Sequence, residues 1–169
     1  LNAIVTAMPD LKNVDSMLEK TFEYLTLEKF MTLKNGSLRN IFKNENNNTD
    51  NNAFNNFKEY LSDINNIVDE RLVWDLYSSE SVIYDPINIV IIEMQVYNGN
   101  LTNPLWVCPV GYNSNIYSSK RKTFVLLKYE NNYEIIVKSS FFNGSKVLSY
   151  LFNKDDEIVI VDDKSNDNS

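Results

Sequence analysis

The sequence predicts an α+β fold in which N-terminal helices pack on a mainly antiparallel sheet of about five strands, formed by residues 86–161. Two observations support this fold class. Apolar residues recur at three- and four-residue spacing as far as residue 79, which is typical of amphipathic helices. From residue 84 onward the apolar runs are β-branched, short and separated by turn residues, which is typical of strands. We expect residues 1–163 to form one domain and residues 164–169 to form a disordered tail.

The first helical segment begins at Asp15 or Ser16, whose side chains are good N-caps. It ends at Gly36, because glycine commonly follows a helix C-terminus. Ser37 then caps a second, short helix over "SLRNIF". The apolar face of the first segment consists of Met17, Leu18, Phe22, Leu25 and Phe30.

An asparagine-rich stretch, "NENNNTDNNAFNN" at residues 44–56, follows these helices. It holds eight of the 26 asparagines and few groups for a core, so we expect a low-complexity loop. After it, one helix is centred on Phe57 and a further short helix spans Asp69–Ser79. Their apolar side chains are Phe54, Phe57, Tyr60, Leu61 and Ile64, and Leu72, Trp74, Leu76 and Tyr77.

Strands are expected after Tyr84. "INIVIIEMQVY" is nearly continuous in apolar residues, as in a strand buried on both faces, and "NGN" at Asn98–Asn100 is a turn signal. "PLWVCPV" is a short strand stopped by Pro109. "TFVLLKY" and "NYEIIVK" form a hairpin, "SSFFNGSKVLSYLF" is a turn that leads into a short helix, and "DEIVIVDD" is the last strand.

The absence of histidine is the strongest constraint on chemistry. Without it the chain has no Cys-His or Ser-His pair and no imidazole base or metal ligand. The four glycines are far apart, so there is no glycine-rich phosphate loop. Neighbouring acids in turns usually point apart, and the acidic runs lack the spacing of a calcium loop. We therefore expect no cofactor and no metal site.

Net charge and hydropathy limit the classes of partner that the chain can bind. The net charge is −7, which disfavours nucleic-acid binding, since phosphates are bound mainly by lysine and arginine. No apolar run approaches the roughly 18 residues that span a bilayer, and the N-terminus lacks the features of a signal peptide. A single cysteine fits a reducing compartment. We expect an intracellular domain. Because residue 1 is not methionine, we expect it to be part of a larger chain.

Several motifs between Phe57 and Val137 carry a resemblance to a known family. They are "VWDL", "NIVIIE", "VCPVGYNS", "KRKTFVLLKY" and "NNYEIIV". In this order they resemble a domain found in large proteins of giant nucleocytoplasmic DNA viruses. Ile135 departs from that pattern, in which proline is frequent. The resemblance implies a viral source, a place in the host cytoplasm or the virion, and an order of elements, but no particular chemistry.

The hairpin "KYENNYEIIVK" carries a second, more distant resemblance, to the C-terminal half of ovarian-tumour-type (OTU) cysteine proteases. In that family a histidine precedes the aromatic residue of the hairpin, whereas here Asn132 precedes Tyr133. The family's Asp-Gly-x-x-Cys nucleophile segment has no counterpart in residues 1–56. The resemblance therefore implies, at most, an OTU-like fold without its catalytic pair.

Candidate site residues follow from these motifs. Cys108 is the only thiol, but it lies in an apolar strand, where free cysteine usually acts as a small buried hydrophobe. Tyrosine and tryptophan are favoured interface anchors. We expect Trp74 and Trp106 in the core, and expect the loop at residues 108–119 to lie at the same end of the sheet as the tip of the hairpin. The predicted binding residues are Tyr112, Tyr117, Asn132 and Tyr133.

The sequence therefore favours a non-catalytic protein-interaction domain, with a ubiquitin-like protein or another viral protein as its partner. Docking is expected through the sheet edge and the tyrosine-bearing loops. One alternative is a deubiquitinase-like hydrolase that uses Cys108 with Asn132 or a carboxylate in place of the protease histidine. Another is a structural virion component.

Overall fold

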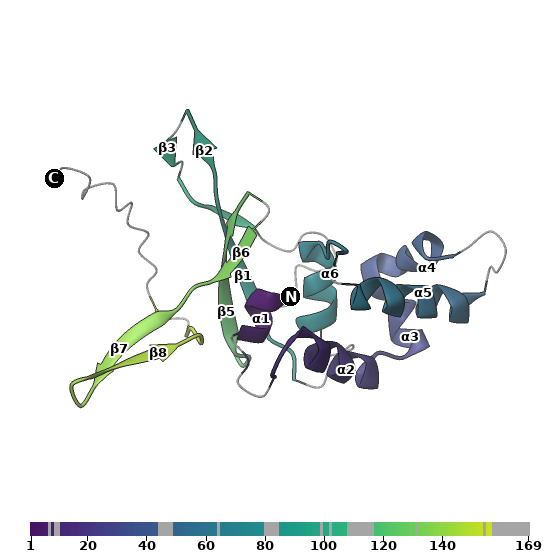
Figure 1. The fold of residues 1–169 in the computed structure, drawn as a ribbon, viewed down its shortest axis with the longest axis horizontal. Coiled ribbons are helices and arrows are strands. Elements are labelled where there is room, and N and C mark those ends of the chain that lie inside the picture. Colours follow the sequence, from purple (N-terminus) through teal and green to yellow (C-terminus); the bar gives the residue numbers. More distant parts are fainter. Residues whose placement is uncertain are drawn as a thin grey trace.

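The computed structural model describes residues 1–6, 8, 11–43, 49–63, 65–79, 85–98, 100, 101, 103–107, 117–130, 132–153, 155 and 156. Helices occupy the N-terminal half and strands the C-terminal half, which confirms the α+β class (Figure 1). The helical elements are α1 (Asn2–Thr6), α2 (Val14–Tyr24), α3 (Leu27–Phe30), the short segment η1 (Leu33–Gly36), α4 (Leu38–Ile41), α5 (Asp50–Ser62) and α6 (Glu70–Tyr77).

The strands form one main sheet and two separate hairpins. The main sheet has the order β4-β1-β5-β6, in which β1 and β5 are parallel and the two outer pairings are antiparallel. The last predicted strand, at residues 156–163, falls largely outside the described residues. The strands are β1 (Asn88–Met94), β2 (Val96–Tyr97), β3 (Asn100–Leu101), β4 (Leu105–Val107), β5 (Thr123–Tyr129), β6 (Asn132–Ile135), β7 (Lys138–Phe142) and β8 (Ser145–Ser149).

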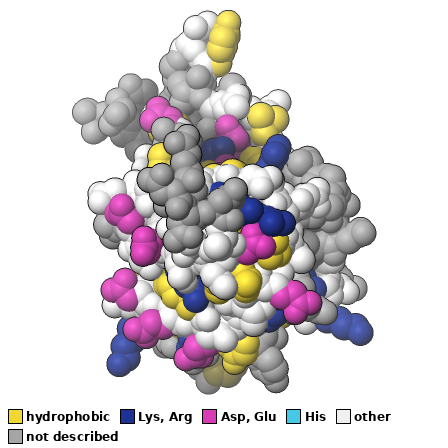
Figure 2. Space-filling view, turned by 90° about the vertical axis from the view of Figure 1, so that its right-hand side faces the viewer, with side chains coloured by type: hydrophobic (Ala, Val, Ile, Leu, Met, Phe, Trp, Pro, Cys, Tyr) yellow, Lys and Arg dark blue, Asp and Glu magenta, His cyan; other side chains and the backbone are white. Residues whose placement is uncertain are grey.

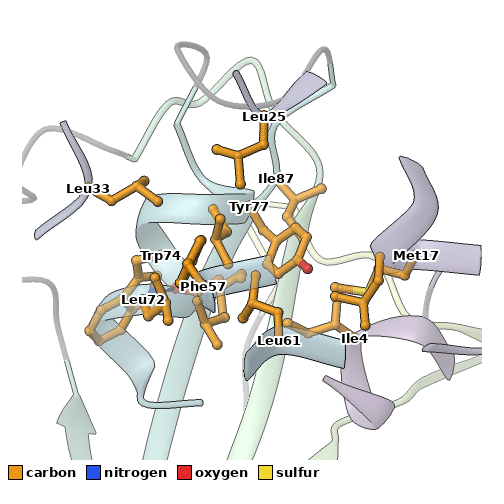
Figure 3. Packing of buried hydrophobic residues seen from close by; sticks show 14 of the residues in the cluster. Ile4, Met17, Leu25, Leu33, Phe57, Leu61, Leu72, Trp74, Tyr77 and Ile87 are labelled. Atoms are coloured by element: carbon orange, nitrogen blue, oxygen red, sulfur yellow. Dashed lines mark hydrogen bonds between the residues drawn. The ribbon is translucent and has the colours of Figure 1, made fainter. Parts of the chain in front are cut away.

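The helices cover one face of the main sheet, and the larger core lies between them. Ile89, Ile91, Phe124 and Leu126 are buried in this core together with side chains of every helix. Figure 3 shows part of it, with Leu61 of α5 and Trp74 and Tyr77 of α6 among the labelled side chains. The opposite face holds a smaller cluster, built on Ile92, Val125 and Phe152. Burial on both faces confirms the expectation for β1. That strand ends at Met94, however, and the chain continues as the separate β2–β3 hairpin.

Helix α6 is the element that joins the helices to the sheet. The Trp74 indole Nε1 donates a hydrogen bond to the Ile89 carbonyl of β1 at 3.0 Å. On the other side of α6, the Thr21 hydroxyl of α2 donates to the Tyr77 hydroxyl at 3.3 Å. Both aromatic side chains are almost fully buried, so each of these polar atoms requires a partner inside the protein.

Two helix boundaries differ from the sequence prediction. The first helical segment breaks at Leu25 and Thr26, and its N-cap is Asn13, which accepts a hydrogen bond from the Ser16 N–H at 2.9 Å. The Asn-rich loop is also shorter than predicted, because α5 begins at Asp50. Thr49 caps α5 and Ala53 and Phe54 are buried, so tertiary packing outweighs the low helix propensity of asparagine.

The prediction of a helix within residues 139–152 is wrong, because these residues form the β7–β8 hairpin. Asn143 and Gly144 both have positive φ angles, 50° and 78°. Asn-Gly with this geometry is the favoured turn of a two-residue hairpin, and its twist matches that of the flanking strands. The Asn-Gly turn therefore determines that this segment forms a hairpin, although the spacing of its apolar residues favours a helix.

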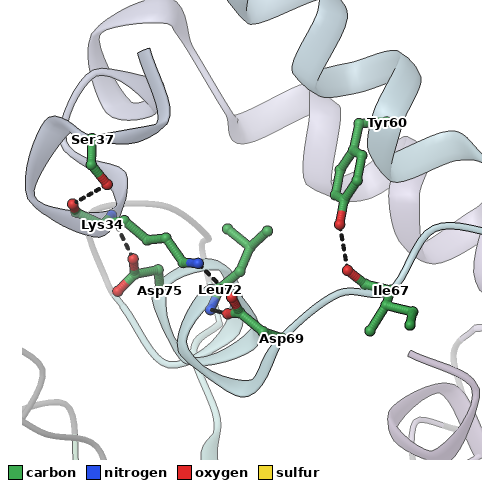
Figure 4. A network of polar contacts seen from close by, with 7 residues as sticks. All are labelled: Lys34, Ser37, Tyr60, Ile67, Asp69, Leu72 and Asp75. Atoms are coloured by element: carbon green, nitrogen blue, oxygen red, sulfur yellow. Dashed lines mark hydrogen bonds and ion pairs between the residues drawn. The ribbon is translucent and has the colours of Figure 1, made fainter. Parts of the chain in front are cut away.

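A left-handed turn precedes α4. Lys34, Asn35 and Gly36 have φ angles of 47°, 57° and 76°. Two carboxylates of the α6 region hold this turn: Asp75 Oδ2 accepts from the Lys34 N–H at 2.7 Å, and Asp69 Oδ2 pairs with Lys34 Nζ at 2.5 Å (Figure 4). Nearby, the Tyr60 hydroxyl donates to the Ile67 carbonyl and fixes the approach to α6.

We predict that two neighbouring substitutions in this turn differ in their effect on stability. Gly36→Ala lowers the free energy of unfolding by about 1–2 kcal/mol, because alanine is strained at positive φ. The new Cβ also lies 3.1 Å from the Met31 carbonyl oxygen. Asn35→Gly changes stability by no more than about 0.5 kcal/mol, since glycine accepts the left-handed conformation. Urea unfolding measures both; equal losses would contradict the left-handed turn.

Candidate functional site

The clearest polar cluster in the described structure forms around the first turn of α6. Glu93, Lys128 and Tyr133 are cross-strand neighbours on β1, β5 and β6, in one row on the helix-covered face. Glu70, in the first turn of α6, reaches down to this row. Side chains distant in sequence thus meet because the sheet register and the position of α6 bring them together.

Glu70 is the centre of the cluster. Its Oε1 accepts hydrogen bonds from Lys128 Nζ at 2.7 Å and from the Tyr133 hydroxyl at 2.5 Å. Lys128 Nζ also lies 3.4 Å from Glu93 Oε2, and Gln95 Nε2 donates to Glu93 Oε1 at 3.2 Å. The glutamates and the lysine are about four-fifths to three-quarters buried at their side chains.

These contacts shift three pKa values. Burial alone would raise the pKa of Glu70, but hydrogen bonds from Lys128 and Tyr133 outweigh it and lower the pKa to about 2. The hydrogen bond to Glu70 raises the pKa of Lys128 above its ordinary value. Burial and then the hydrogen bond to Glu70 raise the pKa of Tyr133 to about 12.

The direction of these shifts shows what the cluster can do chemically. A general acid or base works best with a pKa near the operating pH. Here each shift moves a group further from neutrality, so Glu70 stays ionised and Lys128 and Tyr133 stay protonated. The cluster therefore acts as a fixed ion pair that ties α6 to the sheet.

A small cavity adjoins Glu70 and Tyr133. Its walls include Ile4, Ile91 and Leu126, and its volume is about 40 Å³. A cavity of this size holds a few water molecules. Typical small-molecule sites measure roughly 300–1,000 Å³. This cavity is therefore too small for a substrate or cofactor of ordinary size.

The structure separates two groups of predicted binding residues. Tyr117 is 56% exposed and lies near Asn88 and Thr123, where β1 and β5 begin. Asn132 and Tyr133 are exposed and lie near the opposite end of β5. The expectation that the loop and the hairpin tip share one end of the sheet is therefore wrong for Tyr117. Cys108 and Tyr112 lie outside the described residues.

The two tryptophans also differ from each other. Trp74 is 3% exposed and belongs to the core, as predicted. Trp106 was expected there too, but it is 60% exposed on the edge strand β4. The physical reason is its position: β4 is the outermost strand, and Trp106 pairs with Ile92 on the face that the helices leave uncovered.

Sequence reasoning did not identify Glu70 and Lys128 as partners. Glu93 lies beside Lys128 with a quarter of its side chain exposed. The available signal was a charged residue in each of two apolar strands, "NIVIIEM" and "TFVLLKY", at matching distances from the strand start. Opposite charges at equivalent places in neighbouring strands indicate a cross-strand pair.

Within the described ranges, no group of three His, Cys, Asp or Glu side chains is placed to hold a metal ion. None of the helices in these ranges has the length and apolar character that crossing a bilayer requires. Comparison of the chain with protein-family models, curated proteins and solved structures found no match in any of the three.

We predict that Glu70→Gln lowers the free energy of unfolding at pH 7 by about 1–2 kcal/mol, because it removes a charge that accepts two hydrogen bonds near solvent. Glu70 has a lowered pKa of about 2 in the folded state. The stability that ionised Glu70 contributes to the folded state is therefore fully present above the ordinary carboxyl pKa of about 4.5. It disappears as the pH falls toward 2.

Urea unfolding of the two proteins between pH 7 and pH 2 measures this difference. Glu23→Gln, on the exposed face of α2, is the matched control and should match the unsubstituted protein. A difference between Glu70→Gln and the unsubstituted protein that stays constant to pH 2 would contradict the ion-pair assignment.

Proposed function

We propose that this chain is a non-catalytic protein-interaction domain that docks through strand β4 at the edge of the main sheet. The observation that carries the proposal is Trp106, which is 60% exposed on that strand. Leu105, its neighbour, is 50% exposed. Because successive residues of a strand point to opposite faces, the edge presents an apolar side chain on each side.

The position of β4 supports docking by strand addition. Among the described residues, β4 pairs with β1 on one side and with no strand on the other. Within the described part of the chain, the outer side of β4 therefore has no strand partner, as addition of an extended partner segment requires. Tryptophan is among the residues that contribute most to protein interfaces, since it buries a large area at a small entropic cost.

The inert charge cluster supports the non-catalytic part of the proposal. Glu70, Lys128 and Tyr133 are joined by hydrogen bonds on the helix-covered face, and their pKa shifts keep Glu70 ionised and Lys128 and Tyr133 protonated at neutral pH. On the face of the molecule shown in Figure 2, acidic and basic side chains are interspersed and do not form a basic patch. This supports a protein rather than a nucleic acid as partner.

The proposed class of partner rests on the exposed β4 edge and on the resemblances to a giant-virus domain and to OTU-type proteases. The partner is a protein that offers an extended apolar segment. A ubiquitin-like protein and another viral protein are the two candidates. The edge at Leu105 and Trp106 suits either, because strand addition uses backbone hydrogen bonds together with apolar side chains.

We predict that Trp106→Ala reduces capture of the partner at least about tenfold, as expected for an interface anchor. The readout is quantitative mass spectrometry after affinity capture from source cells, with purified ubiquitin tested in parallel. Stability should change by less than about 0.5 kcal/mol, because the side chain is largely exposed. Ile67→Ala is the control, since Ile67 is 85% exposed but lies away from the sheet edge.

Equal capture by Trp106→Ala and the unsubstituted protein would overturn docking at β4. Labelling of Cys108 by a ubiquitin activity probe, lost in Cys108→Ala, would overturn the non-catalytic assignment and favour the hydrolase.

A further inference from the structure

The β7–β8 hairpin projects from the rest of the described structure. It extends away from the main sheet and from the helices (Figure 1). Its two strands pair with each other, and neither makes an extensive contact with another helix or strand of the described residues. Each strand has five residues, which span about 17 Å at roughly 3.3 Å each. The turn at Asn143 and Gly144 therefore lies about 17 Å beyond the base of the hairpin.

The hairpin is apolar on both faces toward its tip. Cross-strand partners share a face, so the register places Phe142 and Val147 on one face and Phe141 and Leu148 on the other. These side chains are 69%, 44%, 78% and 57% exposed, in that order. A cluster of exposed apolar side chains usually marks a contact with a protein or with a membrane.

Exposure on both faces distinguishes between these partners. A strand added to one edge of the hairpin, from another protein or from a second copy, continues the sheet and leaves both faces uncovered. A flat protein surface covers one face and leaves the other in water. The boundary layer of a bilayer surrounds an inserted hairpin and covers both faces at once. The distribution of the apolar side chains therefore favours a lipid surface.

The charges of the hairpin match a bilayer with anionic headgroups. The whole chain carries 23 acidic residues, yet residues 138–152 contain two lysines and no aspartate or glutamate. Lys138, at the base, pairs with Asp156 at 2.7 Å. Lys146 lies close to the tip, directly across from Phe141. A lysine in this position keeps its ammonium group among the headgroups while its stem lies along apolar side chains.

The backbone limits the depth of insertion. The outer edges of β7 and β8 have no strand partner among the described residues, and unpaired N–H and C=O groups are costly in hydrocarbon. The contact is therefore confined to the boundary of headgroups and acyl chains, at a depth of roughly 5–10 Å. About 7–12 Å of the hairpin stays outside, which is roughly one Debye length and weakens the repulsion between acidic side chains at its base and the headgroups.

We propose that the tip of the β7–β8 hairpin, led by Phe141 and Phe142, inserts into the boundary layer of a bilayer with anionic headgroups. Such a contact lies on the membrane and does not cross it, so it needs no long apolar segment. The inference goes beyond the proposed function and does not depend on it, because the hairpin and the β4 edge belong to separate sheets.

Flotation of the full chain with phosphatidylcholine vesicles that contain phosphatidylserine tests the proposal. Phe141→Ser with Phe142→Ser should lower the vesicle partition coefficient at least about tenfold, because two aromatic side chains then no longer leave water. Phe141→Trp with Phe142→Trp should retain binding, since tryptophan is favoured at the membrane interface. Tyr97→Ser is the matched control and should bind like the unsubstituted protein, because Tyr97 is 72% exposed but lies on the separate β2–β3 hairpin.

A charge reversal tests the class of lipid. Lys146→Glu should lower binding to vesicles with phosphatidylserine at least about fivefold, because an attraction to the headgroups becomes a repulsion. Lys146→Arg should retain binding, since it keeps the charge. The effect of Lys146→Glu should be much smaller on vesicles of phosphatidylcholine alone. An equal loss on both kinds of vesicle would overturn the assignment of anionic headgroups.

Hydrogen exchange locates the contact. Vesicles with phosphatidylserine should slow exchange of the amides at residues 140–148 and leave those of α5 unchanged. Absence of vesicle binding by the unsubstituted protein, or equal binding by the double serine variant, would overturn the proposal. Protection of the hairpin that grows with protein concentration without vesicles would overturn it in favour of a second copy. Protection by a purified protein partner but not by vesicles would overturn it in favour of that partner.

Discussion

The packing of α6 on the sheet is the constraint on which the rest of the fold depends. The Trp74 indole binds the carbonyl of Ile89, and the N–H of Ile87 binds the carbonyl of Tyr77, so the helix is attached to the start of β1 at two places. Asp75 of the same helix holds the left-handed turn at Lys34. Burial of an indole and a phenol is favourable only where their polar atoms find partners, and α6 meets this condition on both sides. The helical layer and the sheet are thus positioned relative to one another by one eight-residue helix.

The cluster of Glu70, Lys128 and Tyr133 shows how a stabilising contact also fixes the protonation state of its members. The hydrogen bonds that tie α6 to β5 and β6 favour the charged carboxylate and the protonated lysine and tyrosine. The same bonds that favour the folded state therefore keep these groups from exchanging protons near neutral pH. The edge of the sheet differs from its covered face, because Trp106 of β4 is exposed there.

The sequence was informative where structure is decided locally and uninformative where it is decided by distant contacts. Apolar spacing located α6 and the β5–β6 hairpin, and Asp69 was the first residue of the predicted helix and is its N-cap. The parallel pairing of β1 with β5 has no local signal, so neither the partnership of Glu70 with Lys128 nor the exposure of Trp106 could be read from spacing alone. The β7–β8 hairpin differs for another reason: the spacing of its apolar residues favours a helix, whereas the Asn143–Gly144 turn favours a hairpin, and the turn determines the structure.

The parallel pairing of β1 with β5 has a consequence for how the chain reaches its native state. Asn88 and Thr123 are 35 positions apart, so the centre of the sheet closes only after a long loop has been brought together. Helical contacts are mostly local and form early, whereas distant strand pairing is slow. During synthesis, the apolar face of α6 is complete well before β5 leaves the ribosome. The nascent chain therefore passes through a stage in which α6 and β1 are complete but β1 lacks its parallel partner β5, and that stage is the one most exposed to aggregation and to chaperones.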